Sequence, residues 1–211
     1  IYVTGVRYDE SIFLVKYNSS GTEQWTQTWS PGGGRGVTVD SSDNIYVTGY
    51  TKGGLDGNTN SGESDIFLIK YKSSGVKQWT KQLGTSSKDQ GRGVTVDSSN
   101  NIYVTGSTFG GLDGNTNSGK DDLFLVKYNS SGTKQWTKQL GSSGNDHGRG
   151  VTVDSSDNIY VTGYTKGGLD GNTWQGNNDI FLVKYNSSGT KQWTQQLGTS
   201  NSDIGSGVTV D

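Results

Sequence analysis

The chain has 211 residues, of which 28% are hydrophobic and 18% are charged, and its formal net charge is −2. The absence of cysteine excludes a disulfide framework, and a near-neutral charge without a basic run argues against a nucleic-acid partner. No stretch of about 18 apolar residues occurs, so we expect no membrane insertion.

A repeat dominates the sequence. The pentapeptide IYVTG begins at Ile1, Ile45, Ile102 and Ile159, and the last three copies start 57 residues apart. A period of this length predicts units that bury their apolar faces only against their neighbours. We therefore expect a single domain over residues 1–211, built from repeats 1–44, 45–101, 102–158 and 159–211.

Each repeat contains four strand-like segments, which are clearest in the second. They are NIYVTGY (44–50), the near-continuous apolar run DIFLIKY (65–71), VKQWTKQLG (76–84) and GVTVD (93–97), all separated by polar loops or turns. No segment has the 3.6-residue apolar spacing of a helix. The pattern predicts an all-β fold with four antiparallel strands per repeat.

Four strands in 57 residues are typical of a propeller blade. The segment GVTVD contains only small side chains besides its Asp, as the crowded axis of a ring requires. We predict a β-propeller of four blades of four antiparallel strands, closed by pairing of the N-terminal strand (1–5) with the C-terminal strand (207–211), which would remove two exposed edges. The alternatives are an arc of a larger propeller and two chains that complete one ring.

The segments GVTVDSSDNIYVTGYT and SDIFLVKYNSSGTKQWTKQLG resemble the SBBP-type β-propeller repeat, and the resemblance covers essentially the whole chain. It implies a propeller of large bacterial surface or secreted proteins that serves binding or scaffolding and has no catalytic residues to transfer. The chain begins inside a strand motif, without Met, as expected of a processed precursor or a segment of a longer protein.

Strand order predicts where binding takes place. In a four-stranded meander, the loops after the IYVTG strand and after the Trp-containing strand emerge on the same face. These loops are long and rich in Asn, Asp and Gly, and long loops on a rigid scaffold commonly carry binding. We expect this face to be the functional surface.

The motif DGNTNSG in this face has the spacing of oxygen ligands in a calcium loop. The candidate ligands are Asp56, Asn58, Asn60 and Asp65 in the second repeat, and Asp113, Asn115, Asn117 and Asp122 in the third. Neither copy has the Gly at loop position six or the final Glu of an EF-hand, so a calcium site here should be weak. The alternative is a loop whose Asx side chains bond their own backbone.

Trp174 replaces the third candidate ligand in the fourth repeat, beside Asp170 and Asn172. An aromatic side chain among Asn and Asp is typical of a sugar-binding spot, so these three residues form the candidate ligand site. The alternative is packing against a neighbouring loop or chain. The other tryptophans on the repeated strand, Trp25, Trp79, Trp136 and Trp193, are predicted to pack between blades.

The remaining candidates point to structure and not to catalysis. His147 is the only histidine and has no Cys or second His as a co-ligand, and the pairs Asp89/Arg92 and Asp146/Arg149 are expected to be ion pairs at blade junctions. We therefore predict a non-catalytic binding or adhesion module, extracellular or at the cell surface, whose partner is a surface glycan or protein. The alternative is a structural component of a surface layer or filament, with self-association.

Overall fold

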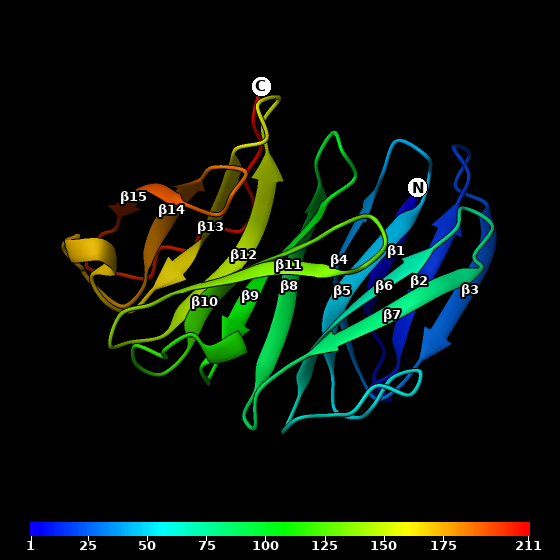
Figure 1. Ribbon diagram of the computed structural model, residues 1–211, viewed down its shortest axis with the longest axis horizontal. Helices are drawn as coiled ribbons and strands as arrows, with labels where there is room; N and C mark the ends of the chain where they lie inside the picture. The colour runs from blue at the N-terminus through cyan, green and yellow to red at the C-terminus, as the bar shows by residue number, and fades with distance from the viewer.

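A computed structural model describes all 211 residues and shows an all-β molecule of fifteen strands in four antiparallel sheets, consistent with a propeller (Figure 1). We refer to the sheets as blades 1 to 4. Blades 2 to 4 are four-stranded meanders, and blade 1 has three strands. The strands are β1 (Tyr2–Val6), β2 (Ile12–Tyr17) and β3 (Glu23–Trp29) in blade 1; β4 (Gly32–Val39), β5 (Ile45–Thr51), β6 (Asp65–Tyr71) and β7 (Lys77–Leu83) in blade 2; β8 (Asp89–Val96), β9 (Ile102–Thr108), β10 (Asp122–Tyr128) and β11 (Lys134–Leu140) in blade 3; β12 (Asp146–Val153), β13 (Ile159–Thr165), β14 (Asp179–Tyr185) and β15 (Lys191–Leu197) in blade 4.

The only helices are two single turns in the long loops, η1 (Leu112–Gly114) and η2 (Leu169–Gly171). No helix is long and apolar enough to cross a membrane. Blades 2 to 4 each begin with an inner strand, β4, β8 or β12, and these three strands run through the middle of the molecule (Figure 1). The repeat boundaries predicted at 45, 102 and 159 therefore fall between the first and second strands of a blade.

The inner strands are longer than predicted. β8 begins at Asp89, four residues before the predicted Gly93, because Asp89 pairs with Thr108 of β9 and extends the ladder. The register shifts between Gly91 and Gly93, so Arg92 is the extra residue of a β-bulge. The segment DQGR, predicted to be loop, is therefore part of the strand.

The turn DSSDN explains how the inner strand leads into the next one. The Asp40 carboxylate accepts hydrogen bonds from the backbone N–H groups of Ser42 and Asn44, both at 2.9 Å, and from the Tyr46 hydroxyl at 2.9 Å. The same bonds recur at Asp97 and Asp154. One side chain thus forms the turn and satisfies the hydroxyl of a tyrosine on the adjoining strand.

The glycine of IYVTG is required by close packing on both sides. A Cβ at Gly49 would collide with the carbonyl oxygen of Gly33 on the inner strand and would lie 2.9 Å from the ring of Phe67. The neighbouring Thr48 hydroxyl donates to the Phe67 carbonyl at 2.8 Å, and this bond recurs in every blade. The threonine of the TG pair therefore bonds the third strand, and its glycine allows the second strand to approach the inner strand closely.

The core lies between blades, as three apolar clusters that each join two adjacent sheets. The cluster between blades 2 and 3, for example, combines Ile66 and Leu68 with Val104 and Phe124. The repeated tryptophans add to these contacts, as predicted. Each ring contacts a tyrosine of its own blade, and the rings of blades 1 to 3 also lie against the hairpin glycine of the next blade, in the pairs Trp25/Gly75, Trp79/Gly132 and Trp136/Gly189.

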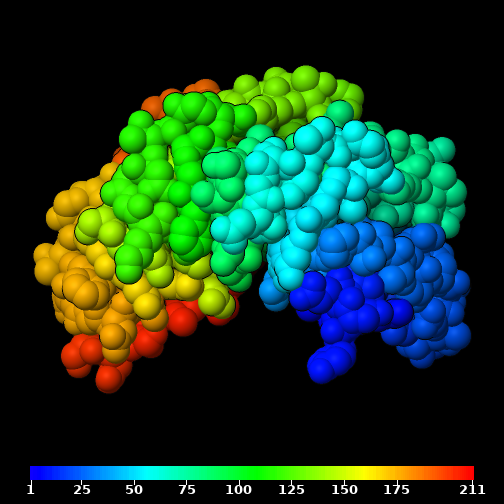
Figure 2. Space-filling view, turned by 90° about the horizontal axis from the view of Figure 1, so that it is seen from below, coloured from blue at the N-terminus to red at the C-terminus, as the bar shows by residue number.

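Closure of the four blades into a ring is not observed. Residues 207–211 form no strand and do not pair with β1. The Gly205 N–H instead bonds the Gly163 carbonyl of blade 4 at 3.1 Å, so this segment lies beside blade 4 where the inner strand of a further blade would lie. The blades describe an open arc with its two ends apart (Figure 2), which is the shape of the alternative, an arc of a larger propeller.

This packing predicts unequal effects for two equivalent tryptophans. Trp136 is covered by blade 4, whereas Trp193 has no further blade against it and is 37% exposed. Trp136→Ala should lower the free energy of unfolding by about 3 to 5 kcal/mol because it opens a cavity between blades, and Trp193→Ala should lower it by only about 1 kcal/mol. Denaturant melts of both variants measure this, and equal losses would contradict packing between blades as the source of the stability.

Candidate functional site

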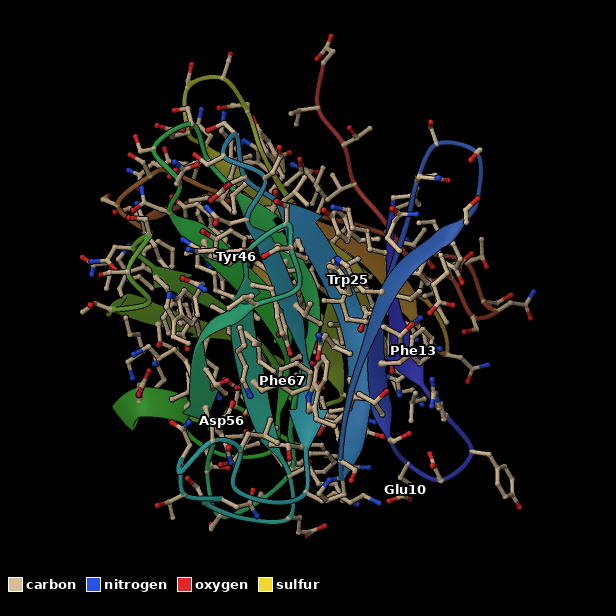
Figure 3. The ribbon with its side chains drawn as sticks, turned by 90° about the vertical axis from the view of Figure 1, so that its right-hand side faces the viewer. Glu10, Phe13, Trp25, Tyr46, Asp56 and Phe67 are labelled. Carbon is tan, nitrogen blue, oxygen red and sulfur yellow. The ribbon has the colours of Figure 1, made fainter.

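The long loops 52–64, 109–121 and 166–178 lie at one end of the sheets and define what we call the loop face. Glu10, in the short loop of blade 1, and Asp56, in the long loop of blade 2, are at this same end, whereas Tyr46 lies toward the opposite end (Figure 3). The loops that follow the IYVTG strands of blades 1 and 2 therefore share one end of the sheets, as strand order predicts. The buried Leu55, Leu112 and Leu169 anchor the three loops to the blades.

Each loop turns at an aspartate in the left-handed region, with φ values of 50° at Asp56, 52° at Asp113 and 50° at Asp170. The Asp56 carboxylate accepts a hydrogen bond from Lys77 Nζ at 2.6 Å and another from the Thr80 hydroxyl. The same lysine and threonine contacts hold Asp113 and Asp170. These three aspartates are therefore engaged with the outermost strand of their own blade.

The ion pairs also affect the pKa of two of these carboxyls, Asp56 and Asp170. Burial alone would raise the pKa of Asp56, but the hydrogen bonds from Lys77 and Thr80 and the charge of Lys77 outweigh it and hold the pKa below its usual value. The pKa of Asp170 is lowered in the same way by Lys191 and Thr194. A lowered pKa stabilises the fold above about pH 4, and this contribution is lost as the pH falls through the pKa of the folded state.

The other predicted calcium ligands bond the loop itself. The Asn58 amide donates to the Leu55 carbonyl at 2.7 Å, and the Asn60 amide donates to the Gly62 carbonyl. Asp65 accepts from the Ser61 N–H at 2.8 Å and from the Gln82 amide at 3.0 Å. In the third repeat, Asn115, Asn117 and Asp122 make corresponding bonds. These contacts favour the alternative of an Asx-bonded loop, and no three acidic, His or Cys side chains gather into a metal-binding group.

Calcium binding stays a prediction, and it now requires Asp56 to release Lys77. If the loops bind calcium at about 10⁻⁴ to 10⁻³ M, millimolar calcium raises the melting temperature by mass action, and the double variant Asp56→Ala with Asp113→Ala abolishes the rise. Asp170→Ala is the matched control, because the loop of blade 4 lacks the third ligand. Identical melting curves in calcium and in chelator would remove the calcium site.

Trp174 lies on a hollow of about 350 Å³ between the loops of blades 3 and 4. We call this hollow the Trp174 cleft; its lining residues are Lys120, Ser143, Gly144, Asn145, Lys166, Trp174 and Asn177. Trp174 is 46% exposed, so much of its indole ring is free to contact a ligand. The other lining groups are ammonium, amide and hydroxyl groups and backbone, which bind by hydrogen bonding.

The structure does not bring the three residues of the predicted ligand site together in this cleft. Asp170 is held by Lys191 and Thr194, and the Asn172 amide donates to the Leu169 carbonyl at 2.8 Å. Neither lines the cleft, whereas Trp174 does. Lys166 and Asn177 belong to the same loop as Trp174, whereas Lys120, Ser143, Gly144 and Asn145 come from other loops. Sequence analysis missed these partners because Lys120 and Asn145 are distant from Trp174 in the chain.

The lysines of the Trp174 cleft differ from those at the other junctions. Between blades 1 and 2, Lys52 pairs with Glu10 at 2.8 Å, and between blades 2 and 3, Lys88 pairs with Glu63 at 3.5 Å. Lys120 and Lys166 form no ion pair. The sequence does carry a signal for this difference, because Lys120 occupies the repeat position of Glu63.

His147 is structural in its contacts. Its Nε2 lies 2.6 Å from the carboxylate of Asp121, and its ring stacks on Tyr164 with centroids 4.8 Å apart. The predicted ion pairs of Asp89 with Arg92 and of Asp146 with Arg149 are absent. Both aspartates instead accept from threonine and serine groups beneath the loop face, and burial raises the pKa of each despite those bonds.

Comparison with known proteins identifies the repeat. Residues 33–56, 78–113 and 135–170 match the SBBP family, described as a β-propeller repeat. The chain is 27% identical over 240 residues to the regulatory protein FlaEY of Caulobacter vibrioides, a match that covers 96% of this chain and 25% of that protein. It is 28% identical over 222 residues to a WD repeat-containing protein of Acanthamoeba polyphaga mimivirus, covering 81% of this chain and 16% of that protein.

The chain thus spans a quarter or less of the length of these curated relatives. Among solved structures, the chain is similar to a protein of unknown function from Bacteroides caccae, at 10% identity and a TM-score of 0.35. The alignment covers 95% of this chain and 79% of that protein.

Proposed function

Since the chain carries β-propeller repeats of the SBBP family, we propose that it is a non-catalytic binding or adhesion module that acts outside the cell or at its surface. The ligand is a surface glycan or a protein, and it binds at the Trp174 cleft. The observation that carries this proposal is the exposed Trp174 at a position where the second and third repeats have Asn.

The equivalent residues show why Trp174 is unexpected there. Asn117 donates from its amide to the Lys120 carbonyl at 3.0 Å and accepts from the Gly119 N–H at 2.8 Å, and Asn60 bonds the Gly62 carbonyl. Trp174 has no amide and forgoes these bonds. Trp174 lacks the loop hydrogen bonds of the equivalent residues and exposes an aromatic ring. Ligand binding explains this substitution better than folding does.

The cleft chemistry fits a sugar. An indole ring offers an apolar face to the C–H groups of a pyranose, and the nearby amides of Asn145 and Asn177 both donate and accept hydrogen bonds. Ser143 adds a hydroxyl. Such a combination of one aromatic surface with several polar groups is common in ligand sites.

Trp174→Asn restores the residue of the other repeats and tests the proposal. The substitution should change the free energy of unfolding by no more than about 0.5 to 1 kcal/mol, as for a surface position, and should abolish the glycan binding of the wild type on an array. Phe109→Asn is the control, because Phe109 is 48% exposed on the same face and lies outside the cleft. A destabilisation as large as that of Trp136→Ala, or unchanged binding, would refute the role of Trp174.

The structural alternative is supported by the open edge of blade 1. Val3 of β1 is 43% exposed, and residues 207–211 carry the inner-strand sequence GVTVD without a sheet partner. Inner strands pair with second strands in a constant register, for example Val37 with Val47. Pairing of Val208 with Val3 in that register would complete blade 1, either within one chain as a closed ring or between chains as an assembly.

Sedimentation and small-angle X-ray scattering separate these cases. Ring closure predicts a compact monomer, and exchange between chains predicts association that increases with protein concentration. Val3→Lys should abolish either one because it places a charge on the pairing edge, whereas Val76→Lys, at an exposed hairpin residue, should change neither. A wild type that stays monomeric and as open as the arc of Figure 2 would contradict both forms of pairing.

A further inference from the structure

Arginines recur at one position of the inner strands. Arg35 in β4, Arg92 in β8 and Arg149 in β12 are each the extra residue of a β-bulge, between register positions Gly34/Gly36, Gly91/Gly93 and Gly148/Gly150. A bulge turns a side chain out of the ladder, and bulges are enriched beside functional sites. Only four residues of the chain are arginine, and three of them occupy this position.

The three bulges are neighbours across the blade junctions. A Cβ at Gly36 would lie 2.7 Å from the Arg92 carbonyl oxygen, and a Cβ at Gly93 would lie 2.8 Å from the Arg149 carbonyl oxygen. The inner strands are therefore in van der Waals contact at the bulges. We refer to the side chains of Arg35, Arg92 and Arg149 as the arginine row.

The arginine row lacks carboxylate partners. None of the three forms an ion pair. Arg92 donates to the Gln90 side-chain oxygen at 3.1 Å, and the buried Nε groups of Arg92 and Arg149 have no acceptor. Arg35 and Arg149 lie over the rings of Tyr50 and Tyr164, at 5.6 and 5.1 Å, contacts that accommodate a cation without neutralising it.

The carboxylate of Asp121 forms no ion pair with the row. The charge of Asp121 opposes the lowering of the Arg92 pKa, but its carboxylate lies 2.6 Å from the Nε2 atom of His147. Burial and the neighbouring charges of Arg149 and Arg35 lower the pKa of Arg92. Three like charges with donors left free are an unfavourable arrangement in the ligand-free protein.

We propose that the arginine row is a binding site for an oxyanion group, namely a sulfate, phosphate or carboxylate, at the inner edge of the arc. Guanidinium groups present paired N–H donors that match the oxygens of such groups, and the charge of the anion offsets the repulsion within the row. The site is separate from the Trp174 cleft, with which it shares no lining residue. The oxyanion is either free in solution or carried on an acidic polysaccharide.

Arg92→Ser is the variant that tests the site. Serine occupies the corresponding position of the C-terminal segment, Ser206, and it is a small neutral residue that removes the guanidinium group. Arg7→Ser is the matched control, because Arg7 is the one arginine outside the row. Titration calorimetry with sodium sulfate, and with dextran sulfate against neutral dextran, measures affinity at fixed ionic strength.

We expect saturable binding of sulfate or dextran sulfate by the wild type, a loss of about tenfold or more in Arg92→Ser, and no change in Arg7→Ser. Binding of sulfate itself identifies a site for free oxyanions, and binding of dextran sulfate alone identifies a site for a polymer-borne one. Absence of saturable binding to either, or equal affinities of wild type and Arg92→Ser, overturns the proposal.

Thermal melts separate a ligand site from a structural role. In chloride without oxyanions, Arg92→Ser should melt at a higher temperature than the wild type, because it removes repulsion and an unpaired buried donor. In sulfate, the wild type should gain more than the variant. Arg92→Lys keeps the charge without the paired donors, and should retain only part of the affinity. An Arg92→Ser protein that melts lower by the same amount in chloride and in sulfate would show that the arginine is structural.

Discussion

Contact between neighbouring blades is the constraint on which this structure depends. Each sheet is too small to bury its apolar residues by itself, and the three clusters of the core all lie between two sheets. The fixed period follows from this requirement, because Trp79 must meet Gly132 of the next blade as Trp136 meets Gly189. A change of length within a strand would move one of these partners, whereas a change in a loop would not.

The same constraint explains which residues are free for function. The aspartates and asparagines of the long loops are occupied by hydrogen bonds within their own blade, and their repetition reflects how the loop folds. A residue that differs from its counterparts in the other repeats is not required for these loop hydrogen bonds. Trp174 and Lys120 both depart from the second repeat, and both line the cleft between blades 3 and 4. In a repeat protein, the differences between units are thus more informative about binding than the shared motifs.

Much of the fold could be predicted from the sequence, because the signals are local. In blades 2 to 4 the second strands begin at IYVTG and the third strands at D(I/L)FL, as expected, since alternating or continuous β-branched and aromatic residues specify them. The early start of β8 could not be predicted, since Asp89 pairs only by virtue of a bulge. Ring closure depends on the angle between blades, which side chains along the whole junction determine together. The cleft could not be predicted for a related reason, because Lys120 of blade 3 meets Trp174 of blade 4 only once the two blades are docked.

The arginine row shows that a repeat can bring like charges together even when the overall amino-acid composition is not basic. A net charge of −2 and arginines 57 residues apart suggest no basic surface. Because a repeat of constant length places equivalent residues on one line, a single arginine per unit becomes a continuous series of guanidinium groups at the inner edge. Selection on folding alone would favour a neutral residue there, such as the serine at Ser206. The recurrence of arginine at the bulge is therefore more informative than the recurrence of the loop aspartates, since the aspartates have charged partners within the blade and the arginines do not.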